Sequence, residues 1–205
     1  MTTRSAMTTR SVPRISLTGR LIIAATVVAG LFGALLDRAL VATPAWRDLD
    51  VRAWADYSRH ADLQNGLLVY SIGGILCWAL VFAAALAYRL DRSAPRQAGP
   101  PIYLAALGAL GAIITTIVAA PVMIHVGQLT DTDIAALHDA FETFTLWGVY
   151  VRGICFAAIF VCSVWALVVY FRYRPAPITR RRTNRGGITL ADQDATNTTI
   201  ATRHQ

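Results

Sequence analysis

The sequence predicts an all-α integral membrane protein: a four-helix bundle with cytoplasmic N and C termini and two short extracytoplasmic helical extensions. Composition and hydrophobic patterning support this fold class. The 205 residues are 55% hydrophobic and only 15% charged, whereas soluble domains are about 25% charged. The apolar residues gather in four runs, and about 20 such residues span a bilayer. The expected spans are about 21–42, 66–88, 102–126 and 146–171.

The placement of arginine predicts the orientation. Every basic residue is arginine, and arginines precede the first run, separate the second from the third, and follow the fourth. The connection after the third run has acidic residues and no basic one. Because basic flanks stay cytoplasmic, both acid-bearing connections are expected outside a multi-pass protein of the plasma membrane. The net charge of +7 then indicates contact with lipid headgroups and no nucleic-acid partner.

Polar ends flank the expected transmembrane domain, 20–171. Residues 1–19 and the basic tail 172–205 lack apolar periodicity, so both are expected to be disordered in the cytoplasm. A cleaved signal peptide is the alternative reading of the N-terminus. An uncleaved first helix is favoured because Asp37 and Arg38 fit poorly in a signal peptide.

The first two helices each present a polar group on an inward side. Ala25, Ala29 and Gly33 recur every four residues, the spacing at which small residues let membrane helices pack closely. Asp37 continues that series and is expected to face another helix. Residues 51–66 read as an amphipathic helix leading into the second span, with Asp62 and Asn65 opposite its solvated face.

The fourth span contains an arginine, Arg152, about two turns inside its apolar run. An unpaired arginine at the centre of a membrane helix costs about 2.5–3.5 kcal/mol on insertion scales. A capping sequence near residue 132 predicts that this helix starts outside the membrane and continues inward as one element. At about 100° per residue, Arg152 shares an azimuth with Ile134 and lies close to Leu137 and Phe141, so it is expected to face the bundle.

These positions predict one polar cluster beneath the outer surface. The preferred pairing joins Arg152 to Asp37 or Asp62. The expected members of this ligand pocket or structural cluster are Asp37, Asp62, Asn65, His125 and Arg152. As a catalytic site, it would use Arg152 to stabilise an anion and His125 or His138 as a base. As a structural element, Arg152 would clamp the helices or extend to the interface.

Several other chemistries lack a sequence signature. The chain has no Cys-x-x-Cys motif, no spaced metal-ligand motif, no phosphate loop and no dinucleotide fingerprint, so neither a metal nor another cofactor is expected. Haem held by two histidines is the alternative that the outer histidines leave open. A channel is disfavoured because the spans carry few polar residues, although an oligomer could build a pore between subunits.

Three stretches carry a resemblance to a known family: AGLFGALL in the first helix, APVMIHV closing the third, and the acid-rich connection into Trp147 and Arg152. Over about residues 20–171 the chain resembles the small four-helix membrane proteins grouped with anthrone oxygenases. Pro121, Trp147 and Arg152 match the family pattern, whereas Met123 stands where the family commonly has asparagine. The resemblance implies cofactor-independent oxidation of polycyclic phenolic substrates by dioxygen.

Two functions are therefore expected. In the first, the protein is a small enzyme acting on an apolar or aromatic substrate in a pocket near the outer face. In the second, it is a non-catalytic membrane subunit or binding protein, forming a homo-oligomer or binding a protein partner, with Arg152 as a structural clamp. A cavity beside Arg152 favours the first, and a close-packed bundle favours the second.

Overall fold

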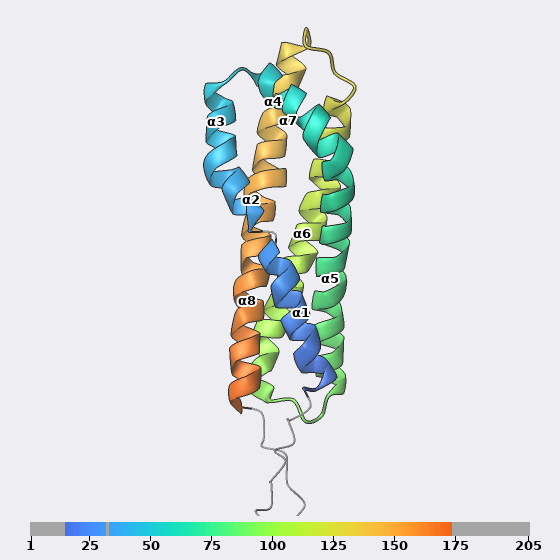
Figure 1. Ribbon diagram of the computed structural model, residues 1–205, viewed down its shortest axis with the longest axis vertical. Coiled ribbons are helices and arrows are strands. Elements are labelled where there is room, and N and C mark those ends of the chain that lie inside the picture. Colours follow the sequence, from blue (N-terminus) through green and yellow to red (C-terminus); the bar gives the residue numbers. More distant parts are fainter. Residues whose placement is uncertain (1–14, 32, 174–205) are drawn as a thin grey trace, which may run out of the picture. The chain divides into compact units, whose positions relative to one another are not determined.

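The computed structural model describes residues 15–31 and 33–173. Over these residues the chain is helical without strands, and it forms four helices long and apolar enough to cross a membrane (Figure 1). They are Leu17–Asp48, Val51–Leu90, Arg96–Val126 and Ile134–Tyr173. The expected all-α architecture with four candidate membrane spans is confirmed.

The boundaries differ from expectation at the first helix. It begins at Leu17, so the prediction of a disordered end through residue 19 is wrong for its last three residues. The predictions for residues 1–14 and 174–205 lie outside the described residues. The second and fourth long helices begin at Val51 and Ile134.

Each long helix is divided into segments. The first contains α1 (Leu17–Leu31), α2 (Ala34–Asp37), η1 (Arg38–Ala42) and α3 (Thr43–Asp48). The second contains α4 (Val51–Tyr57), η2 (Ser58–Gly66) and α5 (Leu67–Leu90). The third contains η3 (Arg96–Ala98) and α6 (Gly99–Val126). The fourth contains α7 (Ile134–Phe144), η4 (Thr145–Val151) and α8 (Arg152–Tyr173).

Three of these segments, η1, η2 and η4, are π-helical. A π-helix has i→i+5 hydrogen bonds and more residues per turn than an α-helix, so each such segment changes the direction of the side chains that follow it. π-helices are rare in proteins and frequent at functional sites. Three of the four long helices contain such a segment, so we expect a functional site beside η1, η2 and η4.

Small residues bring the helices together. α6 packs extensively on α8, and α1 packs on both α5 and α8. Their shared core contains Ala25 and Ala29 of α1 and Ala105, Ala109 and Ala112 of α6. Small side chains allow close backbone approach, which supports helix association where lipid removes the hydrophobic driving force.

Two sets of contacts define the ends of this bundle. At the terminal end, Thr18 near the start of α1 donates to Asp91 between α5 and α6 at 3.1 Å. At the acidic end, Arg59 of η2 binds Asp131 ahead of α7 at 2.7 Å. A second apolar core, which includes Trp54 and Phe141, joins α4 to α7 there. We use these two names for the ends below.

The first helix is interrupted between α1 and α2. The amide of Gly33 donates to the carbonyl of Gly30 at 2.9 Å, and Leu36 donates to Gly33 at the same distance. These i→i−3 bonds tighten the turn and change the phase of the following residues. Arg38 is therefore buried and Asp37 is exposed. The prediction that Asp37 faces another helix is wrong, because it assumed an uninterrupted four-residue repeat.

Beyond this interruption the first helix changes neighbours. α1 packs against α5, whereas η1 contacts η4 of the fourth helix. Figure 1 shows the blue segment 34–48 running beside the fourth helix, apart from α5. This divergence leaves space between the first and second helices in the half of the bundle nearer the acidic end.

Candidate functional site

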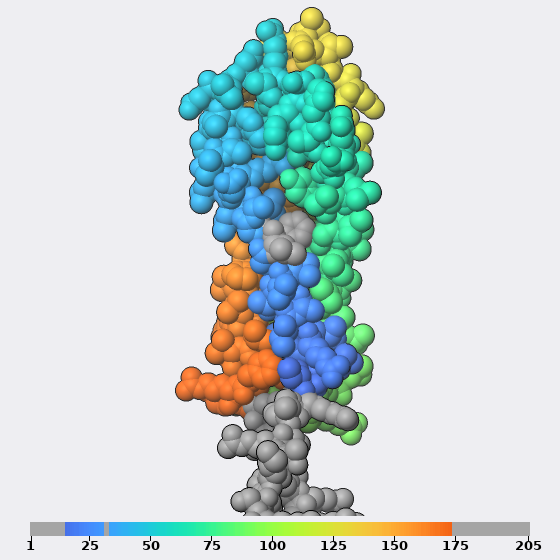
Figure 2. Space-filling model, viewed as in Figure 1, coloured from blue at the N-terminus to red at the C-terminus, as the bar shows by residue number. Residues whose placement is uncertain are grey.

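A cavity of about 270 Å³ lies in this region and is lined by residues of all four long helices. Figure 2 shows a hollow on the visible face between the blue segment 34–48 and the teal residues of η2 and α5. The lining residues are Leu35, Arg38, Asp62, Leu63, Gly66, Leu67, Tyr70, Ser71, Gly74, Ile75, Trp78, Thr116, Ala120, Met123, Ile124, Phe144, Arg152 and Phe156.

Two of the charged lining residues form a buried ion pair. Arg38 binds Asp62 through two hydrogen bonds, Nη1 to Oδ1 at 2.8 Å and Nη2 to Oδ2. Only 8% of Arg38 and 7% of Asp62 is exposed. A bidentate guanidinium–carboxylate pair fixes both position and orientation. This pair therefore joins η1 of the first helix to η2 of the second.

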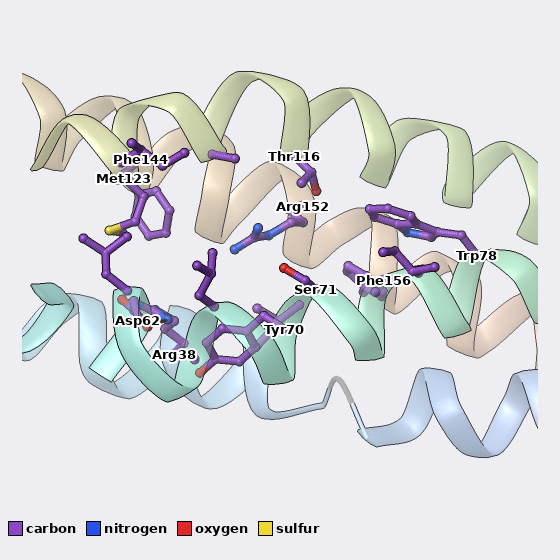
Figure 3. A pocket seen from close by; sticks show the side chains of 18 residues that line it. Arg38, Asp62, Tyr70, Ser71, Trp78, Thr116, Met123, Phe144, Arg152 and Phe156 are labelled. Atoms are coloured by element: carbon purple, nitrogen blue, oxygen red, sulfur yellow. Dashed lines mark hydrogen bonds and ion pairs between the residues drawn. The ribbon is translucent and has the colours of Figure 1, made fainter. Parts of the chain in front are cut away.

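Arg152, the third charged lining residue, has a different environment. Its side chain points from the fourth helix into the cavity (Figure 3). Among the described residues it has no hydrogen bond or ion pair, and its Nε is buried without an acceptor. The guanidinium carbon lies 5.9 Å from the centroid of the Phe144 ring, within cation–π range. A buried cation thus faces the cavity with an aromatic ring as its described partner.

Phe144 connects the two arginines. Arg38 lies 5.5 Å from the centroid of the same ring and 5.2 Å from that of Trp46. Asp62 and Arg38 both act electrostatically on Arg152. Because Asp62 is already bound bidentately by Arg38, the cavity contains two guanidinium groups and one carboxylate. Its formal charge is +1.

The cavity is polar at one end and apolar at the other. Figure 3 shows Arg38, Asp62 and Tyr70 together at one end and Trp78 with Phe156 at the other, with Arg152 and Ser71 between them. Tyr70 is in the first turn of α5 and Trp78 is farther toward the terminal end. The charged part of the cavity therefore lies toward the acidic end, and the apolar part lies deeper along the spans.

The three π-helical segments position these charges. Arg38 is the first residue of η1, Asp62 is within η2, and Arg152 directly follows η4. At the end of η1, the buried hydroxyl of Thr43, the first residue of α3, donates to the carbonyl of Arg38, five residues earlier, at 2.9 Å. In η2, the backbone leaves helical geometry at Gln64, with φ −97° and ψ −106°. Each charge thus sits where its helix departs from α geometry.

The structure brings some predicted site residues together and separates others. Asp62 and Arg152 both line the cavity. The expected pairing of Arg152 is wrong, because Asp62 is bound to Arg38 and Asp37 is exposed. The remaining predicted residues are all exposed and do not line the cavity: Asn65, His125 and His138.

Sequence reasoning missed Arg38 as a site residue. A signal was present, because the insertion cost that applies to Arg152 applies equally to an arginine interrupting the first span. Only the break before α2 decides whether Asp37 or Arg38 faces inward. The aromatic residues Phe144 and Trp78 carried no comparable signal, since aromatic residues are common in membrane helices.

No metal centre is formed by the described residues, which contain no group of three or more histidine, cysteine, aspartate or glutamate side chains suited to an ion. Comparison of the chain with protein-family models, curated proteins and solved structures finds no match. The site must therefore be interpreted from its own geometry.

Proposed function

We propose that the protein binds an apolar small molecule in the Arg152 cavity while embedded in the plasma membrane, with its acidic end outside. The observation that carries this proposal is that Arg152, in the wall of a cavity of about 270 Å³, has no hydrogen bond or ion pair with any residue that the structure describes. Ligand cavities are typically apolar with a few polar groups that orient the ligand. The arginine placement supports the orientation.

The alternative role for Arg152, a structural clamp between helices, receives less support. Clamping requires a partner on another helix, and it is Arg38 that has one, through two hydrogen bonds to Asp62. Arg152 contacts Phe144 of its own long helix. The clamp is therefore assigned to Arg38, which leaves Arg152 available to a ligand.

Filling the cavity tests the proposal. Ala120 lines the cavity, whereas Ala79 is exposed on α5 and does not. In lipid nanodiscs, Ala120→Phe is expected to weaken binding of the two-ring compound 2-naphthalenemethanol at least about tenfold, and Ala79→Phe is expected to leave it unchanged. Empty nanodiscs correct for partition into lipid. Equal binding by both variants would reject the cavity as the site.

We further propose, as a second function, oxygenation of a polycyclic phenolic substrate in the same cavity. The specific observation is that Arg152, which matches an arginine of the anthrone-oxygenase pattern, lines the cavity. It would stabilise the phenolate form of the substrate. His125 and His138 do not line the cavity, whereas the carboxylate of Asp62 does, so Asp62 would act as the base.

Dioxygen consumption tests this second function. Membranes containing the protein are expected to consume one dioxygen per anthrone, forming the anthraquinone and water. Arg152→Met is expected to lower this consumption to that of membranes lacking the protein. His125→Ala is expected to retain activity. Consumption equal to that of membranes lacking the protein would reject the oxygenase function and leave ligand binding intact.

A further inference from the structure

We infer that the cavity selects a monoanionic amphipath from the bilayer: an apolar body bearing one carboxylate or phenolate, with the anionic oxygen bound by Arg152. This inference rests on the proposed ligand-binding function and names the chemical class of the ligand. Four observations support it: the charge of the cavity, the depth of Arg152 in the span, the direction of polarity and the position of the exposed lining residues.

The charge of the cavity is not balanced at Arg152. Removing a guanidinium from water is costly unless an opposite charge or hydrogen-bond acceptors replace the water. Arg38 has such a partner in Asp62, whereas Arg152 has none among the described residues and has a second cation near it. A single negative charge at Arg152 would neutralise the cavity. A neutral ligand would leave that charge uncompensated, and a cation would add to the repulsion.

The length of α8 indicates the depth of Arg152 in the bilayer. α8 runs from Arg152 to Tyr173 over 22 residues, or about 33 Å at 1.5 Å per residue. The hydrocarbon core of a bilayer is about 30 Å thick. If the end of α8 marks one boundary of the hydrocarbon, then Arg152 lies at the other. The anionic group of a membrane-borne amphipath occupies that level.

The direction of polarity matches such a molecule. From Arg152 the cavity continues past Ser71 to Trp78 and Phe156, toward the middle of the span (Figure 3). Tyr70 and Trp78 are eight residues apart on α5, which corresponds to about 12 Å along the helix. A ligand with its anion at Arg152 would place its apolar body along this stretch, in the orientation of a lipid.

The exposed lining residues indicate where the ligand enters. Leu67, Tyr70 and Ile75 of α5 and Ile124 of α6 line the cavity and are also exposed. All four belong to candidate membrane spans. Exposed apolar side chains at these positions would face lipid, so the cavity opens sideways to the bilayer. A ligand dissolved in the membrane reaches the site without crossing water.

The volume limits the size of the ligand. A buried apolar cavity of about 150 Å³ holds one benzene molecule, so 270 Å³ accommodates about two fused rings or a short acyl chain. A longer apolar body would extend through the lateral opening into lipid.

A charge series on one ring system tests the inference without mutation. The probes are 2-naphthoate, neutral 2-naphthalenemethanol and cationic 2-naphthylmethylammonium, measured by equilibrium dialysis with the full chain in nanodiscs at pH 7.4. We expect 2-naphthoate to bind about 10- to 100-fold more tightly than the alcohol, the factor given by one charged hydrogen bond. The ammonium is expected to bind most weakly.

Variants locate the charge preference. Arg152→Met is expected to remove the advantage of 2-naphthoate while leaving the affinity for the alcohol unchanged. Arg152→Lys, which keeps the charge, retains the preference. The control is Arg52→Gln, which removes an arginine exposed at the acidic end and is expected to change neither affinity.

The outcomes separate the inference from the proposed function. Equal affinities for anion and alcohol in the unmodified protein, both weakened by Ala120→Phe, would overturn the monoanion inference and retain the binding function. If Ala120→Phe weakens the binding of none of the probes, both the monoanion inference and the proposed binding function are overturned. A charge preference that survives Arg152→Met would overturn the assignment to Arg152. Decanoate and decanol form a second charge pair with an acyl body. Whichever anion binds more tightly, 2-naphthoate or decanoate, shows whether the natural ligand has an aromatic or an acyl body.

Discussion

At the scale of single residues, the cavity holds its charges in two ways. Arg38 is bound to a carboxylate through Nη1 and Nη2 and lies near the rings of Trp46 and Phe144, while its Nε has no hydrogen-bond partner among the described residues. Arg152 lies near the same Phe144 ring, but no carboxylate within residues 15–31 and 33–173 binds it. Two arginines at helix irregularities thus have different environments: Arg38 joins two helices through Asp62, and Arg152 is the proposed site for an external anion.

The Arg38–Asp62 pair predicts a strongly non-additive mutant cycle. Arg38→Met and Asp62→Leu are each expected to lower the free energy of unfolding by about 3–5 kcal/mol, because each leaves one buried charge without its partner. The double variant is expected to recover most of that loss. Thermal or denaturant unfolding in a mild detergent measures the cycle, and additive losses would contradict the assignment of this pair as the clamp.

Asp91 predicts an acid-sensitive contact at the terminal end. The Ser93 hydroxyl, at 2.6 Å, contributes most to lowering the pKa of the Asp91 carboxyl, and the Ser93 amide and Thr18 add to it. Because the pKa is lower in the folded protein, the stabilisation is complete above the ordinary value of 3.8. It is lost as the pH falls from there through the lowered value.

Comparing the unmodified protein with Asp91→Asn checks this prediction. The unmodified protein is expected to have the higher melting temperature at pH 6, and the difference is expected to shrink progressively as the pH falls below 3.8. A difference that stays constant over this pH range would show that Asp91 does not act through its charge.

At the scale of elements, the π-helical segments explain what sequence periodicity could and could not predict. The four apolar runs follow from composition, and four helices long and apolar enough to span a membrane are present among the described residues. The inward residue of the first helix did not follow, because a four-residue repeat was extended through the break before Gly33. A π segment leaves no regular signal in the sequence, so side-chain directions beyond it cannot be predicted by adding 100° per residue.

The geometry of η1 is expected to depend on the hydroxyl group of Thr43. Thr43→Val keeps the shape of this fully buried side chain and removes its bond to the carbonyl of Arg38. The free energy of unfolding is expected to fall by about 1 kcal/mol. The affinity for 2-naphthoate is also expected to fall, because Arg38 and its neighbours lose their fixed direction.

Thr26→Val is the matched control. Thr26 donates to the carbonyl of Ile22 at 2.8 Å, four residues earlier and within regular α1. It is expected to change stability by a similar or smaller amount without changing the affinity for 2-naphthoate. Equal effects of both variants on binding would contradict a specific role for η1.

At the scale of the whole chain, hydropathy was sufficient to predict four helices and insufficient to predict the site. Four runs of apolar residues admit few alternatives, since a membrane span must satisfy its backbone hydrogen bonds internally. The cavity depends instead on which helices diverge, and the first helix diverges from α5 at one irregular turn. Asp62 and Arg152 were recognised because charge is conspicuous in an apolar run. His125 was predicted as a member of the cluster only because it lies at the same depth in the membrane. Depth does not determine which way a side chain points from its helix.

The proposed orientation predicts a pattern of chemical labelling. In a background with Cys77, Cys155 and Cys162 replaced by alanine, a membrane-impermeant maleimide added to intact cells is expected to label Thr132→Cys and not Arg92→Cys. After permeabilisation both are expected to react. Labelling of position 92 alone in intact cells would reverse the proposed orientation.

The most direct test of the central claim is an experimental structure of the protein in nanodiscs with 2-naphthoate. We expect density for the carboxylate within hydrogen-bonding distance of the Arg152 guanidinium, with the rings between Ser71 and Trp78. Arg38 is expected to remain bound to Asp62. A structure in which Arg152 is bound to Asp62, or in which the ligand lies elsewhere while the cavity is closed, would contradict the account.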